Sequence, residues 1–215
     1  MFAGELTVDA KKVIIAMERV PATFRIWQKG KRTEDIVEQP ARLSNASPHS
    51  VYVGDLDDVV NIGRLQDLRI GMVVNLCPDQ LAGWYAHLPK ALAEAGIVHI
   101  AWPADDNPAF DIIRNVLLRG LGALIDSGLQ NTSVLINCWA GMNRAPAIAI
   151  GYLVLWQQRD LLTTFEETVL QRGGVLENRS FRRLLAKECF PAHVVGLCQF
   201  PNTATSLPCL EPCEK

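Results

Sequence analysis

Residues 134–146 read VLINCWAGMNRAP, in which an apolar run is followed by a cysteine, a glycine-containing turn and an arginine. The run Val134–Ile136 is short and apolar and is followed by polar residues, which is typical of a buried β-strand. Cys138 follows this strand, and Arg144 comes six residues later. Pro146 suits the first turn of a helix, where its missing N–H has no cost. The stretch therefore predicts a strand, a tight turn and a helix, which together form a unit of an α/β fold.

Three other segments have the character of buried strands, because they are short, apolar and bounded by Gly, Pro or Asp. They are Val51–Val53, Met72–Leu76 and Ile97–Trp102. From residue 72 onward the strand-like runs lie between helical segments. We therefore expect a sheet that is covered by helices and largely parallel.

Helical patterns fill the intervals between these strands. In Asp111–Asp126 apolar residues recur at steps of three and four, and the first residue fits the N-cap. A second helix is expected to open at Thr163 or Thr164, since each has a Glu three residues later, and to stop at Gly173–Gly174. A third helix is predicted at Ser180–Glu188, with its apolar residues facing inward.

The composition is that of a globular protein with a full core, since 49% of the 215 residues are hydrophobic and the net charge is −2. A nearly neutral chain has no overall field that attracts nucleic acid, so no nucleic-acid partner is expected. The longest apolar stretch, Ala145–Trp156, is too short to span a bilayer, and the opening MFAGELTVDAKK lacks the apolar segment of a secretory signal. We therefore expect a cytoplasmic or nuclear protein without a transmembrane segment.

Neither a metal site nor a cofactor is predicted. The six cysteines show no paired C-x-x-C spacing, and the four histidines are scattered. Without a secretory signal, reduced thiols in the cytosol are the simplest account of the cysteines.

The segment from Cys138 to Arg144 has the residue types that attack on a phosphate monoester requires. The nucleophile must be anionic, and the dianionic substrate must still be attracted to it. Backbone N–H groups of residues 139–144 can form an anion nest, to which the N-terminus of the next helix adds positive potential. Such surroundings also favour the thiolate form of a cysteine. Gly141 permits the sharp turn, and the planar guanidinium of Arg144 can bind two phosphate oxygens.

Cys138-x5-Arg144 after a strand resembles the phosphate loop of the cysteine-dependent protein phosphatases, specifically of their dual-specificity branch. C-x5-R alone is a loose pattern, for which a buried Cys and an unrelated surface Arg would be the better interpretation. Other segments match that family in the right order, however. SVYVGDLDD (50–58) and LRIGMVVNLCPD (68–79) resemble its first two strands, WPADDNPAFDI (102–112) its general-acid loop, and RGGVLENRSF (172–181) a later active-site segment.

The resemblance implies a single three-layer α/β phosphatase domain with a central, mostly parallel sheet of about five strands flanked by helices. We assign this catalytic domain to residues 47–191. Residues 1–46 are expected to be an N-terminal extension, in which Val13–Met17 could form a helix that packs on the core. Residues 192–215 contain prolines and show no periodicity, so we expect a disordered C-terminal tail.

The same resemblance implies roles for the site residues. Cys138 would attack phosphorus and form a phosphocysteine intermediate, while Arg144 and the loop amides would bind the phosphate oxygens. Asp106 would act as general acid and then as general base, and Asp105 is its rival for that role. The other residues of the phosphate-binding loop would be Trp139, Ala140, Gly141, Met142 and Asn143.

Three further residues bear on how fast such a site would work. Asn178 could orient the hydrolytic water or brace the loop, and an ordinary helix cap is the alternative. Asn137 stands where the family usually has His; because an amide cannot carry charge, the thiolate of Cys138 should be less favoured. Ala145 stands where the family usually has Ser or Thr. Without that hydroxyl, hydrolysis of the phosphoenzyme should slow by roughly one to two powers of ten.

We therefore expect a phosphoprotein phosphatase that acts on phosphotyrosine, phosphoserine or phosphothreonine in protein substrates and serves in signalling. The alternative is a pseudophosphatase, or a very slow enzyme, that binds phosphoproteins in the same pocket. A phosphoinositide phosphatase is less favoured because the loop has no lysine. The sequence leaves open the preference among phosphorylated residues and the oligomeric state.

Overall fold

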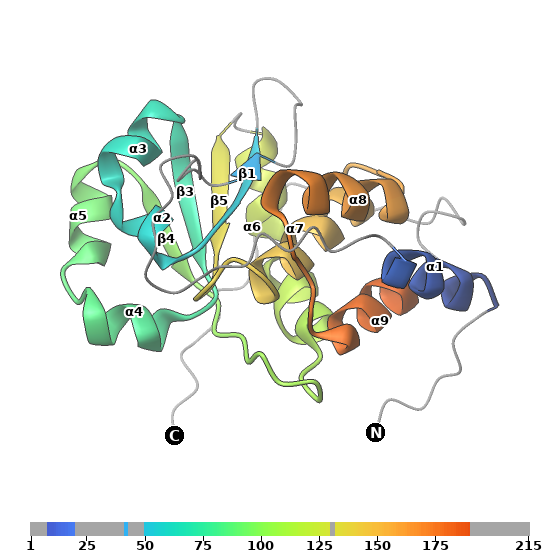
Figure 1. The fold of residues 1–215 in the computed structure, drawn as a ribbon. Coiled ribbons are helices and arrows are strands. Elements are labelled where there is room, and N and C mark those ends of the chain that lie inside the picture. The colour runs from blue at the N-terminus through green and yellow to red at the C-terminus, as the bar shows by residue number, and fades with distance from the viewer. Residues whose placement is uncertain (1–7, 20–40, 43–49, 130–131, 190–215) are drawn as a thin grey trace.

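The computed structural model of the protein describes residues 8–19, 41–42, 50–129 and 132–189 (Figure 1). Its strands are β1 (Ala41–Arg42), β2 (Val51–Gly54), β3 (Ile70–Asn75), β4 (Val98–Ala101) and β5 (Ser133–Asn137). Its helices are α1 (Val8–Arg19), α2 (Leu56–Val60), α3 (Ile62–Asp67), α4 (Pro78–Trp84), α5 (Leu88–Glu94), the π-helical turn η1 (Ile113–Leu117), α6 (Leu118–Leu129), α7 (Arg144–Leu155), α8 (Leu161–Arg172) and α9 (Arg179–Glu188).

The strands of the described residues form one sheet in the order β1-β2-β5-β3-β4. β2, β5, β3 and β4 are mutually parallel, whereas the two-residue β1 pairs antiparallel with β2. The prediction of a mostly parallel sheet is therefore confirmed. Each strand predicted from the sequence is present, with its ends shifted by at most two residues.

Helices cover both faces of the sheet and make the predicted three layers, with α2 to α5 on one side and α1 and α6 to α9 on the other (Figure 1). Successive side chains of β5 point to opposite faces of the sheet, so this strand contributes to the core on both sides. Val134 and Ile136 belong to the core cluster under α7 and α8, whereas Leu135 belongs to the cluster under α4 and α5. Every residue of α7 is buried, so this helix forms the centre of the larger core.

The start of α8 differs from the prediction. The helix begins at Leu161, and its N-cap is Asp160 rather than Thr163 or Thr164, because the Asp160 carboxylate accepts a hydrogen bond of 2.8 Å from the Thr163 N–H. Both threonines therefore lie within the first turn. Gly173 ends the helix as predicted, with a φ of 91° that favours glycine.

The helix predicted from residue 111 onward is also different in detail. Asp111 caps its start as predicted, by accepting a hydrogen bond of 3.0 Å from the Arg114 N–H. The first turn is the π-helical η1, and α6 continues directly from it. Apolar residues at steps of three and four are compatible with either kind of turn, so the sequence pattern could not separate them.

The helix predicted around Val13–Met17 is present as α1 and packs on α8 and α9. Ala10, Ile14 and Met17 are buried in the larger core. The tail expected at 192–215 lies outside the described residues, as does the charged segment between α1 and β1. No helix in the described ranges is long and apolar enough to cross a membrane.

Candidate active site

Four strands end at the same level of the sheet. Gly54 of β2 and Asn75 of β3 both lie opposite Asn137 of β5, and Asn75 lies opposite Ala101 of β4. The segments that follow these strands therefore leave the sheet together at its carboxyl edge. Ligands of parallel α/β proteins bind outside this edge. The loop that starts at Cys138 is consequently surrounded by the segments after β2, β3 and β4.

The loop between β5 and α7 has its carbonyl oxygens bonded to the surrounding segments. The Asn137 carbonyl accepts from the Leu76 N–H at 2.9 Å, the Trp139 carbonyl from the Leu56 N–H at 3.4 Å, and the Met142 carbonyl from the Leu176 N–H at 2.7 Å. Within the described residues, no protein group accepts a hydrogen bond from the backbone N–H groups of residues 139–143. These donors are thus available to an anion, as in a backbone nest.

Gly141 allows the loop to pack closely against Gly54 of β2 and Arg172 of α8. Its φ is 64°, which L side chains rarely adopt. A Cβ at this position would lie 2.8 Å from the Gly54 carbonyl oxygen and would collide with the Arg172 guanidinium. This position therefore requires glycine for two reasons. Glycine permits the sharp turn, as expected from the sequence, and it leaves room for close packing against β2 and α8.

Arg172 of α8, which lies against Gly141, pairs with the carboxylates of Asp55 and Asp58 at the start of α2. Its Nη2 lies 3.3 Å from Asp55 Oδ2 and its Nη1 lies 3.7 Å from Asp58 Oδ2. Burial, followed by repulsion from Asp55, raises the pKa of Asp58 to about 6, although the Arg172 charge opposes this. Motif matching gave no sign of this cluster; the acidic residues in the stretch that follows β2 were the available signal.

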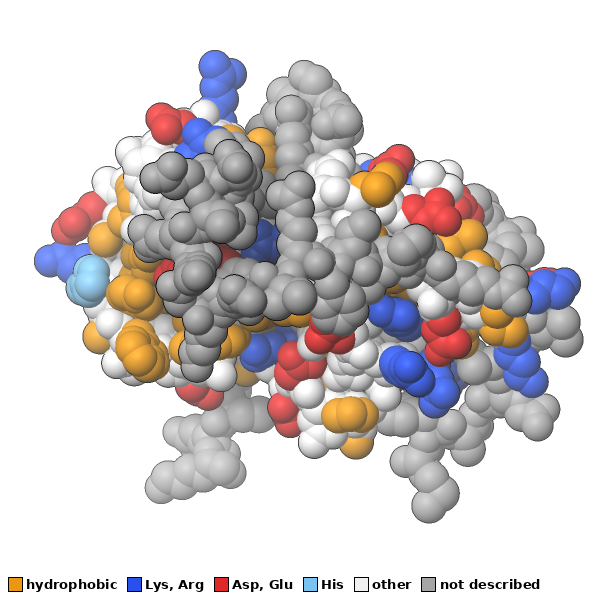
Figure 2. Space-filling model, in the orientation of Figure 1, with side chains coloured by type: hydrophobic (Ala, Val, Ile, Leu, Met, Phe, Trp, Pro, Cys, Tyr) orange, Lys and Arg blue, Asp and Glu red, His pale blue; other side chains and the backbone are white. Residues whose placement is uncertain are grey.

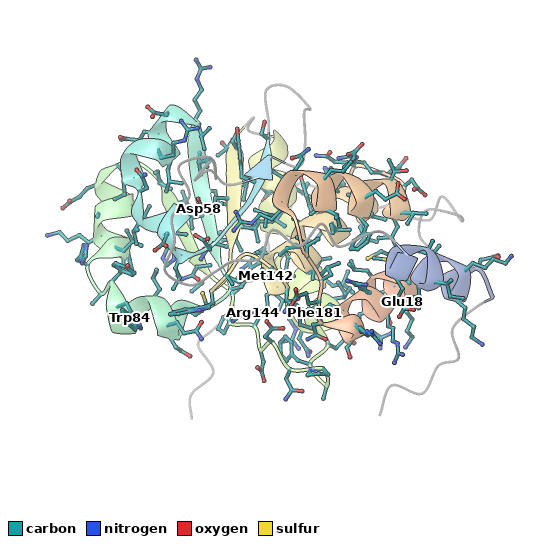
Figure 3. All side chains as sticks on the ribbon, in the orientation of Figure 1. Glu18, Asp58, Trp84, Met142, Arg144 and Phe181 are labelled. Atoms are coloured by element: carbon teal, nitrogen blue, oxygen red, sulfur yellow. The ribbon has the colours of Figure 1, made fainter. Side chains whose placement is uncertain are left out.

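Arg144 lies at the first position of α7 with only 8% of its surface exposed. Its Nη1 donates a 3.1 Å hydrogen bond to the Ala104 carbonyl, which ties the residue to the loop after β4. Its Nε has no hydrogen-bond partner among the described residues and lies 4.0 Å from Asp106 Oδ2. A buried guanidinium with donors to spare is suited to binding an anion. Figure 3 shows Arg144 and Met142 between Trp84 on one side and Phe181 on the other.

Asp106 is held by two amide side chains. Asn143 Nδ2 donates to its Oδ2 at 3.1 Å, and Asn178 Nδ2 donates to its Oδ1 at 3.2 Å. The Asn178 N–H in turn donates to Asn143 Oδ1 at 3.0 Å, which closes the network. Asp105 is exposed and has no hydrogen bond or ion pair within the described residues. The structure therefore brings Asp106 to the loop and leaves Asp105 outside it.

A pocket of about 490 Å³ lies beside this network. It is lined by Asp106, Pro108, Asn143, Glu177, Asn178, Arg179 and Ser180. One wall thus comes from the loop after β4 and the other from the start of α9. All of these lining residues except Pro108 have polar or charged side chains, and the charges are of both signs.

The floor beneath the loop is a buried polar cluster. Asn137 Nδ2 donates to Asn75 Oδ1 at 3.4 Å, and the same oxygen accepts from the Cys77 N–H at 2.9 Å and from Cys77 Sγ at 3.4 Å. Burial is the main reason that the pKa of Cys77 is raised to about 12, with repulsion from Cys138 a smaller contribution that Arg144 opposes. Cys77 therefore stays a thiol at neutral pH.

The remaining loop residues divide between surface and interior. Trp139 and Ala140 are exposed, Met142 and Asn143 are half-buried, and Ala145 is fully buried behind Arg144. Among the described residues, no cluster of His, Cys, Asp or Glu could hold a metal ion.

The sequence is similar to curated proteins that are named dual specificity protein phosphatases. It is 30% identical to rat dual specificity protein phosphatase 26 over 139 residues, which cover 63% of each chain. It is 28% identical to mouse dual specificity protein phosphatase 13B over 141 residues, which cover 63% of this chain and 67% of that protein. The chain is thus similar in sequence to dual-specificity protein phosphatases. No family model matches it, and the match spans about 63% of the length of the first of these relatives.

Solved structures of phosphatases share the fold at low sequence identity. OH1, a tyrosine phosphatase from the Orf virus, matches with a TM-score of 0.61 and 21% identity, covering 84% of this chain and 97% of that one. DUSP15 matches with a TM-score of 0.59 and 15% identity, covering 73% of this chain and 90% of that one. The three-layer phosphatase fold predicted from the sequence is thus confirmed.

Proposed function

We propose that the protein is a phosphatase that hydrolyses phosphotyrosine, phosphoserine or phosphothreonine in protein substrates. The observation that carries the proposal is the hydrogen bonding of the loop between Cys138 and Arg144. Two carbonyls of this loop, those of Trp139 and Met142, bond outward, and the amides of residues 139–143 remain available to an anion. Homology to dual-specificity phosphatases supports the same reaction class.

In the first step, the Cys138 thiolate attacks phosphorus as the bond to the leaving oxygen breaks, and a phosphocysteine forms. The loop amides and Arg144 stabilise the charge that develops on the phosphoryl oxygens. Asp106 gives its proton to the leaving oxygen. Its position fits this role, because Asn143 connects it directly to the loop.

In the second step, a water molecule attacks phosphorus, Asp106 takes a proton from that water, and the sulfur leaves as thiolate. Ala145 has no hydroxyl that could donate to the departing sulfur. One lost hydrogen bond of this kind costs about 1–3 kcal/mol, so the second step is expected to limit turnover.

Rapid-quench kinetics with an aryl phosphate tests this proposal. We expect a burst of phenol followed by slow turnover, and no turnover with Cys138→Ser. Ala145→Ser should speed the slow phase about tenfold, whereas Ala149→Ser places a hydroxyl one turn further along α7 and should not. Linear product release at a fast steady rate would contradict a slow second step.

A phosphoprotein-binding module is the second candidate function. The absence of a hydroxyl at Ala145 and of an imidazole at Asn137 favours it, since both changes reduce catalysis without removing the anion site. Binding of phosphopeptides in the absence of turnover that depends on Cys138 would select this function. If neither binding nor turnover is measured, both functions are excluded.

A further inference from the structure

Two tryptophans form an exposed aromatic surface beside the proposed nucleophile. Trp139 directly follows Cys138 and is 47% exposed, while Trp84, the last residue of α4, is 73% exposed. Their ring centroids are 6.3 Å apart with an interplanar angle of 64°, which is an edge-to-face contact. Exposed apolar patches often mark interaction sites, and tryptophan is enriched among the residues that dominate binding energy.

The fold presents both rings from rigid positions. α4 starts directly after Cys77, at the floor of the site, and Leu81 anchors it in the core cluster on that face of the sheet. Seven helical residues rise about 10 Å, so Trp84 stands well away from the floor. The Trp139 carbonyl accepts a hydrogen bond from the Leu56 N–H, which fixes the backbone beneath the second ring.

The opposite side of the loop has a different character. There the pocket is lined by Asp106, Glu177, Arg179 and other polar residues. In Figure 3, Trp84 lies to one side of Arg144 and Phe181 of α9 lies to the other. Figure 2 shows hydrophobic side chains gathered over the α4 side of the same face. A substrate whose phosphate occupies the loop would therefore meet aromatic rings on one flank and polar groups on the other.

We propose that Trp84 and Trp139 form a subsite that selects phosphopeptides with an aromatic side chain next to the phosphorylated residue. The proposal rests on the phosphate-binding role of the Cys138–Arg144 loop. When that loop holds the phosphate, the neighbouring residue of an extended peptide lies about 3.8 Å further along the chain, measured between Cα atoms. It is thus placed at the rim, where it can contact the Trp pair.

A peptide suits this surface better than a membrane lipid does. The other exposed large hydrophobic residues of the described ranges belong to α1, β4, α6 and α8; they are Ile15, Val98, Leu118 and Leu170. α4 carries a single charged side chain, that of the acidic Asp79, which anionic lipid headgroups would repel. The surface therefore matches one side chain rather than a long acyl chain.

Fluorescence anisotropy on the Cys138→Ser protein tests the subsite without requiring turnover. The probes are labelled phosphotyrosine peptides with Ala on both sides, or with Phe immediately before or after the phosphotyrosine. We expect one Phe peptide to bind about tenfold more tightly than the Ala peptide. Adding Trp84→Ala should reduce that preference to within about twofold, whereas Trp84→Phe should keep part of it. Leu170→Ala, which removes an exposed apolar side chain from α8, is the matched control and should leave the preference intact.

The outcomes separate this proposal from the proposed function. Equal binding of all peptides, or a Phe preference that survives Trp84→Ala, overturns the subsite even if the wild-type protein turns over phosphopeptides. A preference that depends on Trp84, in a protein without turnover, supports the subsite and excludes the enzyme. Binding to vesicles that contain a phosphorylated lipid, dependent on Trp84 and without any Phe preference among peptides, also overturns it.

Discussion

Asn178 serves two elements with one side chain. Its Oδ1 accepts a hydrogen bond of 3.1 Å from the Ser180 N–H at the start of α9, and its Nδ2 donates to Asp106. The sequence presented capping and bracing as alternatives. The structure shows the cap, and the same side chain also contacts Asp106, because the oxygen and the nitrogen of one amide point to different neighbours.

Substitution of Asn178 can separate these two contributions. Asn178→Ser keeps an oxygen that can cap α9 but is too short to hold Asp106, so stability should change little while general-acid catalysis weakens. We expect kcat/KM to fall about tenfold for phenyl phosphate and much less for a nitrophenyl phosphate, whose leaving group needs little protonation. Asn178→Ala should show the same kinetic effect and also lose about 1 kcal/mol of stability.

Steady-state kinetics on the two phosphates, together with urea unfolding, measure both effects. Equal losses on the two phosphates would mean that Asn178 does not act through the proton donor.

The end of α8 supports the loop between β5 and α7 through charge. Arg172 is close to Gly141 of the loop and is paired with Asp55 and Asp58 at the start of α2. One helix therefore stiffens a loop that belongs to a different part of the chain. Motif matching could not reveal this, because no sequence spacing connects residue 172 with residues 55 and 58.

The raised pKa of Asp58 makes part of the stability depend on pH. The folded-state pKa is about 6, above the ordinary aspartate value of 3.8, so the folded protein binds this proton more tightly than the unfolded chain does. The contribution of this tighter proton binding to the free energy of unfolding is fully present below about pH 4 and is lost as the pH rises through 6. Asp58→Asn should therefore gain up to about 2 kcal/mol relative to wild type between pH 4 and pH 7.5.

Urea unfolding across this pH range measures the difference between the two proteins. Asp57→Asn makes the same charge change at an exposed neighbour and should follow the wild-type curve. Parallel curves for wild type and Asp58→Asn would show that this carboxyl does not titrate differently on folding.

At the scale of the whole molecule, α1 is part of the core. Met17 is fully buried against the larger cluster, whereas Ile15 on the same helix is 48% exposed. Met17→Ala should cost about 2–5 kcal/mol of unfolding free energy, and Ile15→Ala about 0.5 kcal/mol or less. Equilibrium unfolding in urea provides the comparison. Similar small losses from both variants would mean that α1 does not stay docked in solution.

The sequence predicted the sheet and the loop because both depend on local patterns. Runs such as Val134–Ile136 are short and apolar enough to define strands without knowledge of their neighbours. The prediction of where α8 starts was wrong, because Asp160, a stronger N-cap than Thr163, lies before two leucines that were not assigned to the helix. The contact of Trp84 with Trp139 and the approach of Arg172 to Gly141 depend on how distant segments pack, which a single sequence does not encode as a local pattern.

Because β2, β5, β3 and β4 end at one level, the segments around the phosphate loop are anchored separately in a rigid sheet. A longer or shorter connection after any one strand alters one wall and leaves the other anchor points where they are. Cys138 and Arg144 follow β5 whereas Trp84 lies in the segment after β3, so these residues are carried by independent segments. Homologous proteins can diverge in what they select while retaining the same reaction centre.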